Sequence, residues 1–119
     1  MADIRLYGIP NCDTVKRARA WLAAQGVEHE FHDFKKAGVP DPELQRWLAT
    51  LGWARLLNRA GTTWRKLDEA QRAAAADEAG AAALMRAQPS LIKRPVVRWP
   101  DGGFSVGFDA EAWSRRLPR

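Results

Sequence analysis

A strand–loop–helix–strand pattern at the start of the chain limits it to a small set of α/β folds. Ile4 to Tyr7 is expected to form a short strand, ended by a loop that contains Gly and Pro. Apolar side chains at three- and four-residue spacing predict a helix from Asp13 to Gln25, and Gly26 supplies its stop. A second strand is expected from Val27 to Phe34, and Lys35 to Pro42 then breaks regular structure. Two strands joined by one helix normally lie parallel, with a right-handed crossover.

The middle of the chain predicts a helical block. Asp41 is placed to cap a helix over residues 42–51, whose apolar stripe is rich in leucine. Gly61-Thr62-Thr63 marks a turn. The alanine-rich stretch 67–87 is typical of helix, and we expect two short helices that part near residues 77–80.

The last third of the chain predicts a hairpin and a final helix. Residues 96–99 and 104–107 form its two strands, joined by a Gly-containing turn at 100–103. Asp109 is placed to cap a helix that runs through Leu117. The predicted fold is therefore an α/β layered domain with a mixed sheet, formed as one unit over residues 1–119.

Size and composition agree with a single soluble domain. The chain has 119 residues, of which 46% are hydrophobic and 28% charged, which is ordinary globular usage. We expect neither a secretion signal nor a membrane span, because the start has no basic-then-apolar pattern and no long apolar run follows. One cysteine cannot form an internal disulfide, and a lone thiol favours a reducing compartment, the cytoplasm.

The net charge of +5 does not by itself predict a nucleic-acid partner. The basic clusters are short and scattered along the chain, and no DNA- or RNA-binding motif accompanies them. A small anionic ligand needs fewer positive charges and remains open.

Cys12 is the residue best placed for chemistry. It follows the strand-ending loop and directly precedes the first helix, whose unpaired N–H groups stabilise an anion. Such sites lower a cysteine pKa from about 8.5 to roughly 3.5–7.5, and the thiolate is the nucleophile. Lys16 and Arg17 add positive charge nearby. The alternative is a buried cysteine without a role, but polar neighbours argue against an apolar pocket.

Three other groups of residues are weaker candidates. Lys93-Arg94-Pro95 precedes a strand, and by composition alone a solvated basic turn is its more common interpretation. The loop from Asn58 to Thr63 is an ordinary polar loop by the same criterion. His29, His32 and one distant cysteine are too few ligands for zinc, although His32 as a catalytic base stays open. The six tryptophans are placed mostly at core spacing.

Three motifs in order resemble one family. Gly8-Ile9-Pro10-Asn11-Cys12-Asp13-Thr14, then the run from Leu56 to Leu67, then Ile92-Lys93-Arg94-Pro95 resemble the arsenate reductase (ArsC), Spx and YffB-like family. The middle motif resembles the YffB branch more than arsenate reductase proper. The resemblance implies a thioredoxin-like fold with a mixed sheet, an inserted helical block, and a cis peptide bond before Pro95.

The resemblance also implies the site. Cys12 is its nucleophile and Arg94 its main anion contact. The other expected contacts to an anion are Arg59, Asn58, Asn11 and Lys16. Thr14 and Pro95 are expected to be structural neighbours of the site.

Two departures from arsenate reductase bear on the substrate. Arsenate reductases place an arginine directly after the Leu-Leu pair, where this chain has Asn58, with Arg59 one step later. They also carry an arginine in the final hairpin, where this chain reads Val106-Gly107-Phe108. Each lost charge-assisted hydrogen bond removes roughly 1.5–3 kcal/mol from oxyanion binding.

The leading hypothesis is a glutathione-dependent thiol reductase or thiol-disulfide oxidoreductase in which Cys12 attacks and an external thiol resolves the product. Its expected partners are glutathione or glutaredoxin and a small anionic or disulfide substrate, with no bound cofactor or metal, in a monomer. One alternative is an arsenate reductase that uses glutathione or glutaredoxin. Another is an Spx-like regulator that binds RNA polymerase without catalysis. Spx usually switches through Cys-x-x-Cys, whereas this chain has only Cys12-Asp13-Thr14-Val15.

Overall fold

The computed structural model describes residues 3–117, which group into two compact units. The first unit consists of residues 3–36 and 94–117, and the second of residues 37–93. The expected single domain over 1–119 begins and ends outside the described residues, and it stays a prediction.

The first unit contains a four-stranded mixed sheet. Its strands are β1 (Arg5–Gly8), β2 (Glu30–Asp33), β3 (Val96–Arg98) and β4 (Phe104–Val106), in the order β2-β1-β3-β4. The predicted parallel pairing of β1 with β2 is confirmed, and the other two pairs are antiparallel. Leu6 on the central strand lies opposite Phe31 on one side and Val97 on the other.

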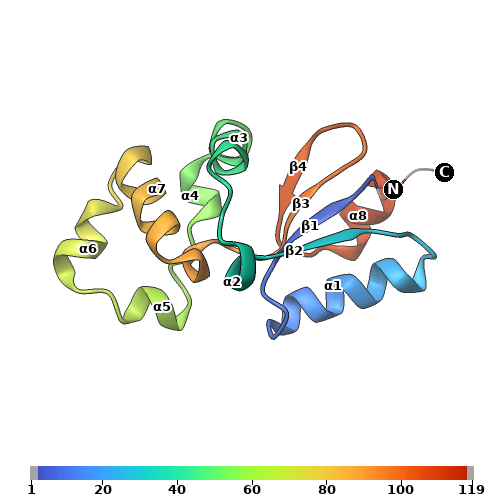
Figure 1. The fold of residues 1–119 in the computed structure, drawn as a ribbon, viewed down its shortest axis with the longest axis horizontal. Coiled ribbons are helices and arrows are strands. Elements are labelled where there is room, and N and C mark those ends of the chain that lie inside the picture. Colours follow the sequence, from blue (N-terminus) through green and yellow to red (C-terminus); the bar gives the residue numbers. More distant parts are fainter. Residues whose placement is uncertain (1–2, 118–119) are drawn as a thin grey trace. The chain divides into compact units, whose positions relative to one another are not determined.

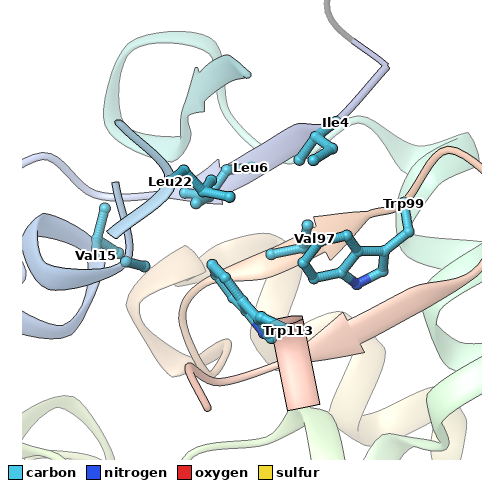
Figure 2. Packing of buried hydrophobic residues seen from close by; sticks show 8 residues of the cluster. Ile4, Leu6, Val15, Leu22, Val97, Trp99 and Trp113 are labelled. Atoms are coloured by element: carbon cyan, nitrogen blue, oxygen red, sulfur yellow. The ribbon is translucent and has the colours of Figure 1, made fainter. Parts of the chain in front are cut away.

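Two helices of this unit lie alongside the sheet, α1 (Asp13–Ala24) and α8 (Ala110–Arg116) (Figure 1). Their apolar side chains meet those of the strands in one cluster (Figure 2). The buried members of this cluster are Ile4, Leu6, Val15, Ala18, Leu22, Val97, Trp99 and Trp113. Because Trp99 and Trp113 also stack edge to face, with ring centroids 5.1 Å apart, they join the hairpin to the last helix.

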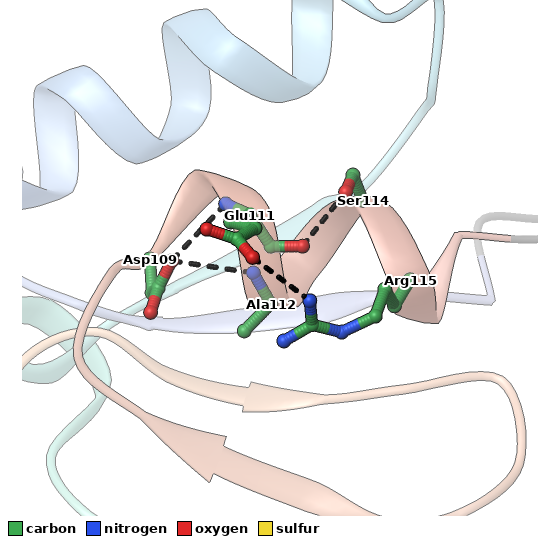
Figure 3. Close-up of polar contacts among 5 residues, drawn as sticks. All are labelled: Asp109, Glu111, Ala112, Ser114 and Arg115. Atoms are coloured by element: carbon green, nitrogen blue, oxygen red, sulfur yellow. Dashed lines mark hydrogen bonds and ion pairs between the residues drawn. The ribbon is translucent and has the colours of Figure 1, made fainter.

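The last helix begins as predicted. The Asp109 carboxylate accepts hydrogen bonds from the backbone N–H groups of Glu111 and Ala112, at 3.0 and 3.2 Å (Figure 3). Farther along, Arg115 forms an ion pair with Glu111 one turn earlier, and the Ser114 hydroxyl donates to the Glu111 carbonyl. The cap formed by Asp109 satisfies backbone N–H donors that have no partner at the start of a helix.

The second unit is helical, as the sequence predicts. Its elements are α3 (Asp41–Leu51), α4 (Trp53–Leu56), α5 (Thr62–Arg65), α6 (Glu69–Ala74), α7 (Glu78–Ala87) and the 3₁₀ turn η1 (Pro89–Leu91). The predicted separation of two short helices near residues 77–80 is confirmed by α6 and α7. An isolated antiparallel bridge joins Leu57 to Ile92.

Three local predictions are wrong. The second strand is shorter than residues 27–34: it begins only at Glu30, because the Val27 N–H still donates to the Leu22 carbonyl at the end of α1. It ends at Asp33, whose carboxylate accepts the Lys35 N–H at 2.8 Å where the helical turn α2 (Phe34–Ala37) begins. Asp41 lies within the first turn of α3, behind Pro40 as the cap, and its carboxylate pairs with Arg86. Residues 62–65 form the helical turn α5, where the sequence predicts only a turn.

α6 and α7 approach each other at a glycine. The Asp77 carboxylate caps α7 by accepting the Gly80 N–H at 2.8 Å. A Cβ atom added to Gly80 would lie 1.7 Å from the Ala74 carbonyl oxygen. Backbone cannot yield as a flexible side chain can, so this contact requires glycine.

We therefore expect Gly80→Ala to lower the free energy of unfolding by about 1–3 kcal/mol, the usual cost of an overpacked site. Without the close contact, the same change would stabilise the helix by about 0.5–1 kcal/mol. The sign of the change in the free energy of unfolding, measured by urea denaturation, shows whether the close contact or helix propensity dominates. Ala83→Gly on the exposed side of α7 calibrates helix propensity, and a stabilised Gly80→Ala protein would contradict the contact.

Candidate active site

The first unit holds the candidate nucleophile at the start of α1. Cys12 is the residue before the helix, its backbone is extended, and its carbonyl accepts the Lys16 N–H at 2.9 Å. Gly8 sets how closely the helix approaches β1, because a Cβ atom there would lie 2.8 Å from the Val15 Cγ2 methyl. The thiol is half-buried, and it packs beside the apolar cluster of this unit.

The surroundings of Cys12 favour the thiolate. Partial burial raises the pKa of the thiol, but the Val15 N–H, the Arg94 guanidinium and the Thr14 N–H all lower it. Arg94 acts both through a hydrogen bond to the sulfur and through its charge. The pKa of Cys12 therefore lies below its ordinary value.

Strand pairing explains why Arg94 reaches a residue so distant in sequence. Tyr7 of β1 pairs with Val96 of β3 in an antiparallel register. The residues just before β3 therefore lie beside the loop that follows β1 and ends at Cys12. The peptide bond between Arg94 and Pro95 is cis, as the resemblance implies, and the Pro95 carbonyl accepts the Gly107 N–H at 2.9 Å.

Two other predicted anion contacts lie in this unit, Asn11 and Lys16, and their roles stay predictions. Asn11 and Lys16 are exposed, and Arg94 is the cation among the main influences on the Cys12 pKa. Arg17 donates to the Thr14 hydroxyl at 3.4 Å. The sequence missed the backbone donor Val15 as an individual contact, although the start of a helix signals such donors in general.

Asn58 and Arg59 belong to the second unit. The Asn58 side-chain oxygen accepts the Ala60 N–H at 3.0 Å, which closes a turn within its own loop. The Arg59 guanidinium lies over the rings of Trp53 and Trp64. That either residue contacts an anion held at Cys12 stays a prediction.

The histidines have different surroundings. His29 accepts a hydrogen bond from Arg19 at 3.2 Å, and its pKa is lowered, first by burial and then by the charge of Arg19. His32 lies on β2 against the rings of Tyr7 and Phe34. Across residues 3–117, no group of three or more His, Cys, Asp or Glu side chains is placed to hold a metal ion.

The hairpin position that carries an arginine in arsenate reductases has an aromatic neighbour here. The ring of Phe108 packs against Trp113 and Trp21, with centroids 4.8 and 6.2 Å apart. Of the six tryptophans, Trp47, Trp99 and Trp113 are buried, whereas Trp21, Trp53 and Trp64 are half-buried. The expectation that the tryptophans are core residues therefore holds for half of them.

Comparison with known proteins gives the family. The model of the ArsC family matches residues 7–115, a range that includes Cys12 and Arg94. The chain belongs to the ArsC family. Between β2 and β3 in sequence, this ArsC-family chain carries the second unit, so its fold is thioredoxin-like with a mixed sheet and an inserted helical block, as predicted.

Three similar proteins fit this assignment. The solved structure of the YFFB (PA3664) protein is 52% identical, covers 97% of this chain and 99% of its own, and has a TM-score of 0.91. An uncharacterized protein of Haemophilus influenzae is 40% identical over 92% of this chain and 95% of its own. The global transcriptional regulator Spx of Streptococcus agalactiae is 27% identical over 98% of this chain and 84% of its own.

The Cys12 surroundings predict how its reactivity depends on pH. Alkylation consumes thiolate, so a lowered pKa moves the midpoint of the rate profile below about 8.5, the value of an ordinary cysteine. Iodoacetamide rates measured from pH 4 to 10 report this midpoint. Arg94→Ala should raise it, because the change removes both a hydrogen bond to the sulfur and a positive charge.

Lys16→Ala is the matched control, since it removes an exposed cation from the same helix start, and its shift should be smaller. A wild-type midpoint at or above about 8.5 would contradict a stabilised thiolate. An unchanged midpoint in Arg94→Ala would contradict the role of the guanidinium.

Proposed function

We propose that this protein is a glutathione-dependent thiol reductase that uses Cys12 as its single nucleophile. The observation that carries the proposal is the contact of the Arg94 guanidinium with the Cys12 sulfur at the start of α1. A half-buried thiol with a lowered pKa and a neighbouring arginine combines a reactive sulfur with a contact for an anionic partner. Membership of the ArsC family supports thiol chemistry of this kind.

The proposed cycle has two thiol–disulfide exchanges. The Cys12 thiolate attacks the glutathione sulfur of a mixed disulfide, so that a Cys12–glutathione disulfide forms and the substrate leaves as a thiolate, which takes a proton from water. A glutathione thiolate, which has lost its proton to water, then attacks the glutathione sulfur bound to Cys12. Oxidised glutathione leaves, and the Cys12 thiolate is restored.

The single cysteine makes the external thiol necessary. Cys12 is the only cysteine in the sequence, so no second thiol of this chain can resolve a disulfide at Cys12. Glutathione or glutaredoxin would supply that thiol, which fits a reducing compartment such as the cytoplasm. Within residues 3–117, the structure contains no helix long and apolar enough to cross a membrane.

The direct test is turnover of a glutathionylated peptide with glutathione, followed as oxidised glutathione through a coupled reductase. We expect turnover that Cys12→Ser abolishes while leaving the thermal midpoint nearly unchanged, because the substitution replaces one atom at a half-buried site. Absence of turnover above the uncatalysed rate would overturn the proposal.

Arg94 should serve the bound anion more than the fold. Arg94→Ala should lower kcat/KM by about 10- to 150-fold, the equivalent of one charge-assisted hydrogen bond of roughly 1.5–3 kcal/mol. Rates compared well above the alkylation midpoints, where every variant is fully thiolate, separate partner binding from thiol acidity. Lys93→Ala is the control, because Lys93 is exposed and adjacent in sequence.

Two outcomes would contradict this role for Arg94. Unfolding of Arg94→Ala, seen by circular dichroism, would make Arg94 a structural brace. Unchanged stability together with an unchanged rate would show that Arg94 contributes neither to the fold nor to the bound anion.

Arsenate reduction is the second enzymatic candidate, favoured by the family. The hairpin places Phe108 against aromatic rings and supplies no arginine there, and Asn58 uses its oxygen within its own turn. We therefore expect poor arsenate turnover even with glutathione and glutaredoxin present. Efficient arsenite production that depends on Cys12 would show that these departures do not matter.

A regulator without catalysis is the candidate from another class, favoured by the similarity to Spx. The discriminating observation is binding to RNA polymerase that survives Cys12→Ser. Such binding, in a protein without thiol turnover, would favour the regulator over the reductase.

A further inference from the structure

A row of charged side chains crosses the sheet of the first unit on the face away from α1 and α8. Arg5 of β1 lies opposite Glu30 of β2 on one side and opposite Arg98 of β3 on the other. Leu6 and Val97 pack in the cluster that includes residues of the two helices. Because side chains alternate between the two faces of a strand, the charged residues share the other face.

The acid of this row is engaged by one of the two arginines. The Nε and Nη2 of Arg5 both donate to the Glu30 carboxylate, at 3.0 and 2.7 Å. The hydrogen bond and the charge of Arg5 lower the pKa of Glu30, and the charge of Arg98 adds to this effect. Within residues 3–117, the Arg98 side chain donates no hydrogen bond and forms no ion pair. Arg98 is therefore the cation of the row with available donors.

The position of Arg98 is unfavourable without an anion. Its partner on β1 is another arginine, and like charges directly opposite each other destabilise a sheet. Its Nε is enclosed without a hydrogen-bond partner, whereas the residue as a whole is half-buried. The terminal nitrogens of the guanidinium are thus the atoms that can reach a ligand, and their planar fork matches a carboxylate. A carboxylate bound there would offset the repulsion between the two arginines.

The strand beside β3 has a free edge. β4 is the last strand in the order β2-β1-β3-β4, and within residues 3–117 no further strand pairs with it (Figure 1). The Trp99 N–H donates to the Gly103 carbonyl at 2.8 Å, at the turn end of this hairpin. Because hydrogen-bonded pairs alternate along an antiparallel ladder, Phe104 and Val106 direct their backbone groups away from β3. Edge groups of this kind can pair with an added strand.

An extended peptide with one acidic side chain fits both features. Its backbone would pair with the edge of β4, and its carboxylate would reach toward Arg98 across Phe104, which carries no charge. Arg98 and the added strand are two strand spacings apart, about 9–10 Å, which an arginine and a glutamate side chain can span together. A second copy of this chain fits less well, because its own edge carries the same arginines.

We propose that β4 and Arg98 form a docking site for an extended, acidic segment of a partner protein. The segment adds a strand at the edge of β4 and places one carboxylate against Arg98. Arg5 begins β1, whereas Cys12 follows the loop at its end. Docking therefore does not use the thiol, and its test is independent of turnover.

The test uses two pentapeptides that are blocked at both ends and differ in one residue. TVEVT carries one glutamate, and TVQVT carries glutamine in its place. Binding to the ¹⁵N-labelled full chain is followed by NMR through the backbone amides and the Nε–H signal of Arg98. Hydrogen exchange of the same amides is measured with and without peptide.

We expect the Kd of TVEVT to be about tenfold lower than that of TVQVT, the equivalent of one charge-assisted hydrogen bond. TVEVT should shift the Arg98 signal and slow exchange at the outward amides of Phe104 and Val106. The Ser105 amide, which faces β3, should change less. Arg98→Gln should remove the difference between the two peptides, and Arg98→Lys should retain part of it.

Arg115→Gln is the matched control, because it removes the same charge from an exposed arginine on α8. Its preference for TVEVT should stay within about twofold of wild type, as expected for a surface charge screened by salt. Circular dichroism shows whether each variant folds. If Arg98→Gln does not fold, the comparison of the two peptides on the wild-type protein carries the test.

Four results would overturn the proposal. The first is equal binding of the two peptides to the wild-type protein, and the second is an equal loss of preference in Arg115→Gln. The third is a shift of the Arg98 signal by sodium acetate at the same concentrations as TVEVT, which would indicate a site for a free carboxylate. The fourth is protection of the outward β4 amides that rises with protein concentration without peptide, which would assign the edge to a second copy of the chain.

Discussion

The antiparallel pairing of β1 with β3 is the interaction on which the candidate site depends. β1 ends in the loop that leads to Cys12, and β3 begins just after Arg94. Their register brings the sulfur and the guanidinium together, although most of the chain separates them in sequence. Without this pairing, α1 would still offer N–H groups to the thiol, but the cation and the anion contact that it provides would be missing.

The sequence predicted the elements of the first unit well because each has a strong local signal. The spacing of apolar residues and the Gly and Pro residues between elements define β1 and α1, and Asp109 caps α8 as expected. Predictions failed where one hydrogen bond decides a boundary, as at Asp33, whose carboxylate accepts the Lys35 N–H so that Phe34 begins a helical turn instead of ending the strand. Such competition between a side chain and the backbone leaves little trace in hydrophobic spacing.

The site was predictable in part. The position of Cys12 before a helix pointed to the thiolate, but sequence alone ranked Arg94 with ordinary surface basic residues, and only the family resemblance singled it out. Lys16 and Arg17, adjacent in sequence, were expected to supply charge that Arg94 supplies in the structure. The contacts of Arg59 with Trp53 and Trp64 escaped prediction because helical spacing does not distinguish a half-buried ring from a buried one.

The bare backbone of Gly8 connects packing to acidity. Because β1 has no side chain at this point, the Val15 methyl can lie against the strand, and the N–H of the same valine is a main contact that lowers the Cys12 pKa. A larger residue at position 8 would push Val15 outward and carry its amide away from the sulfur. The pKa of the Cys12 thiol therefore depends on the spacing between β1 and α1, which is set by residues that do not take part in the reaction.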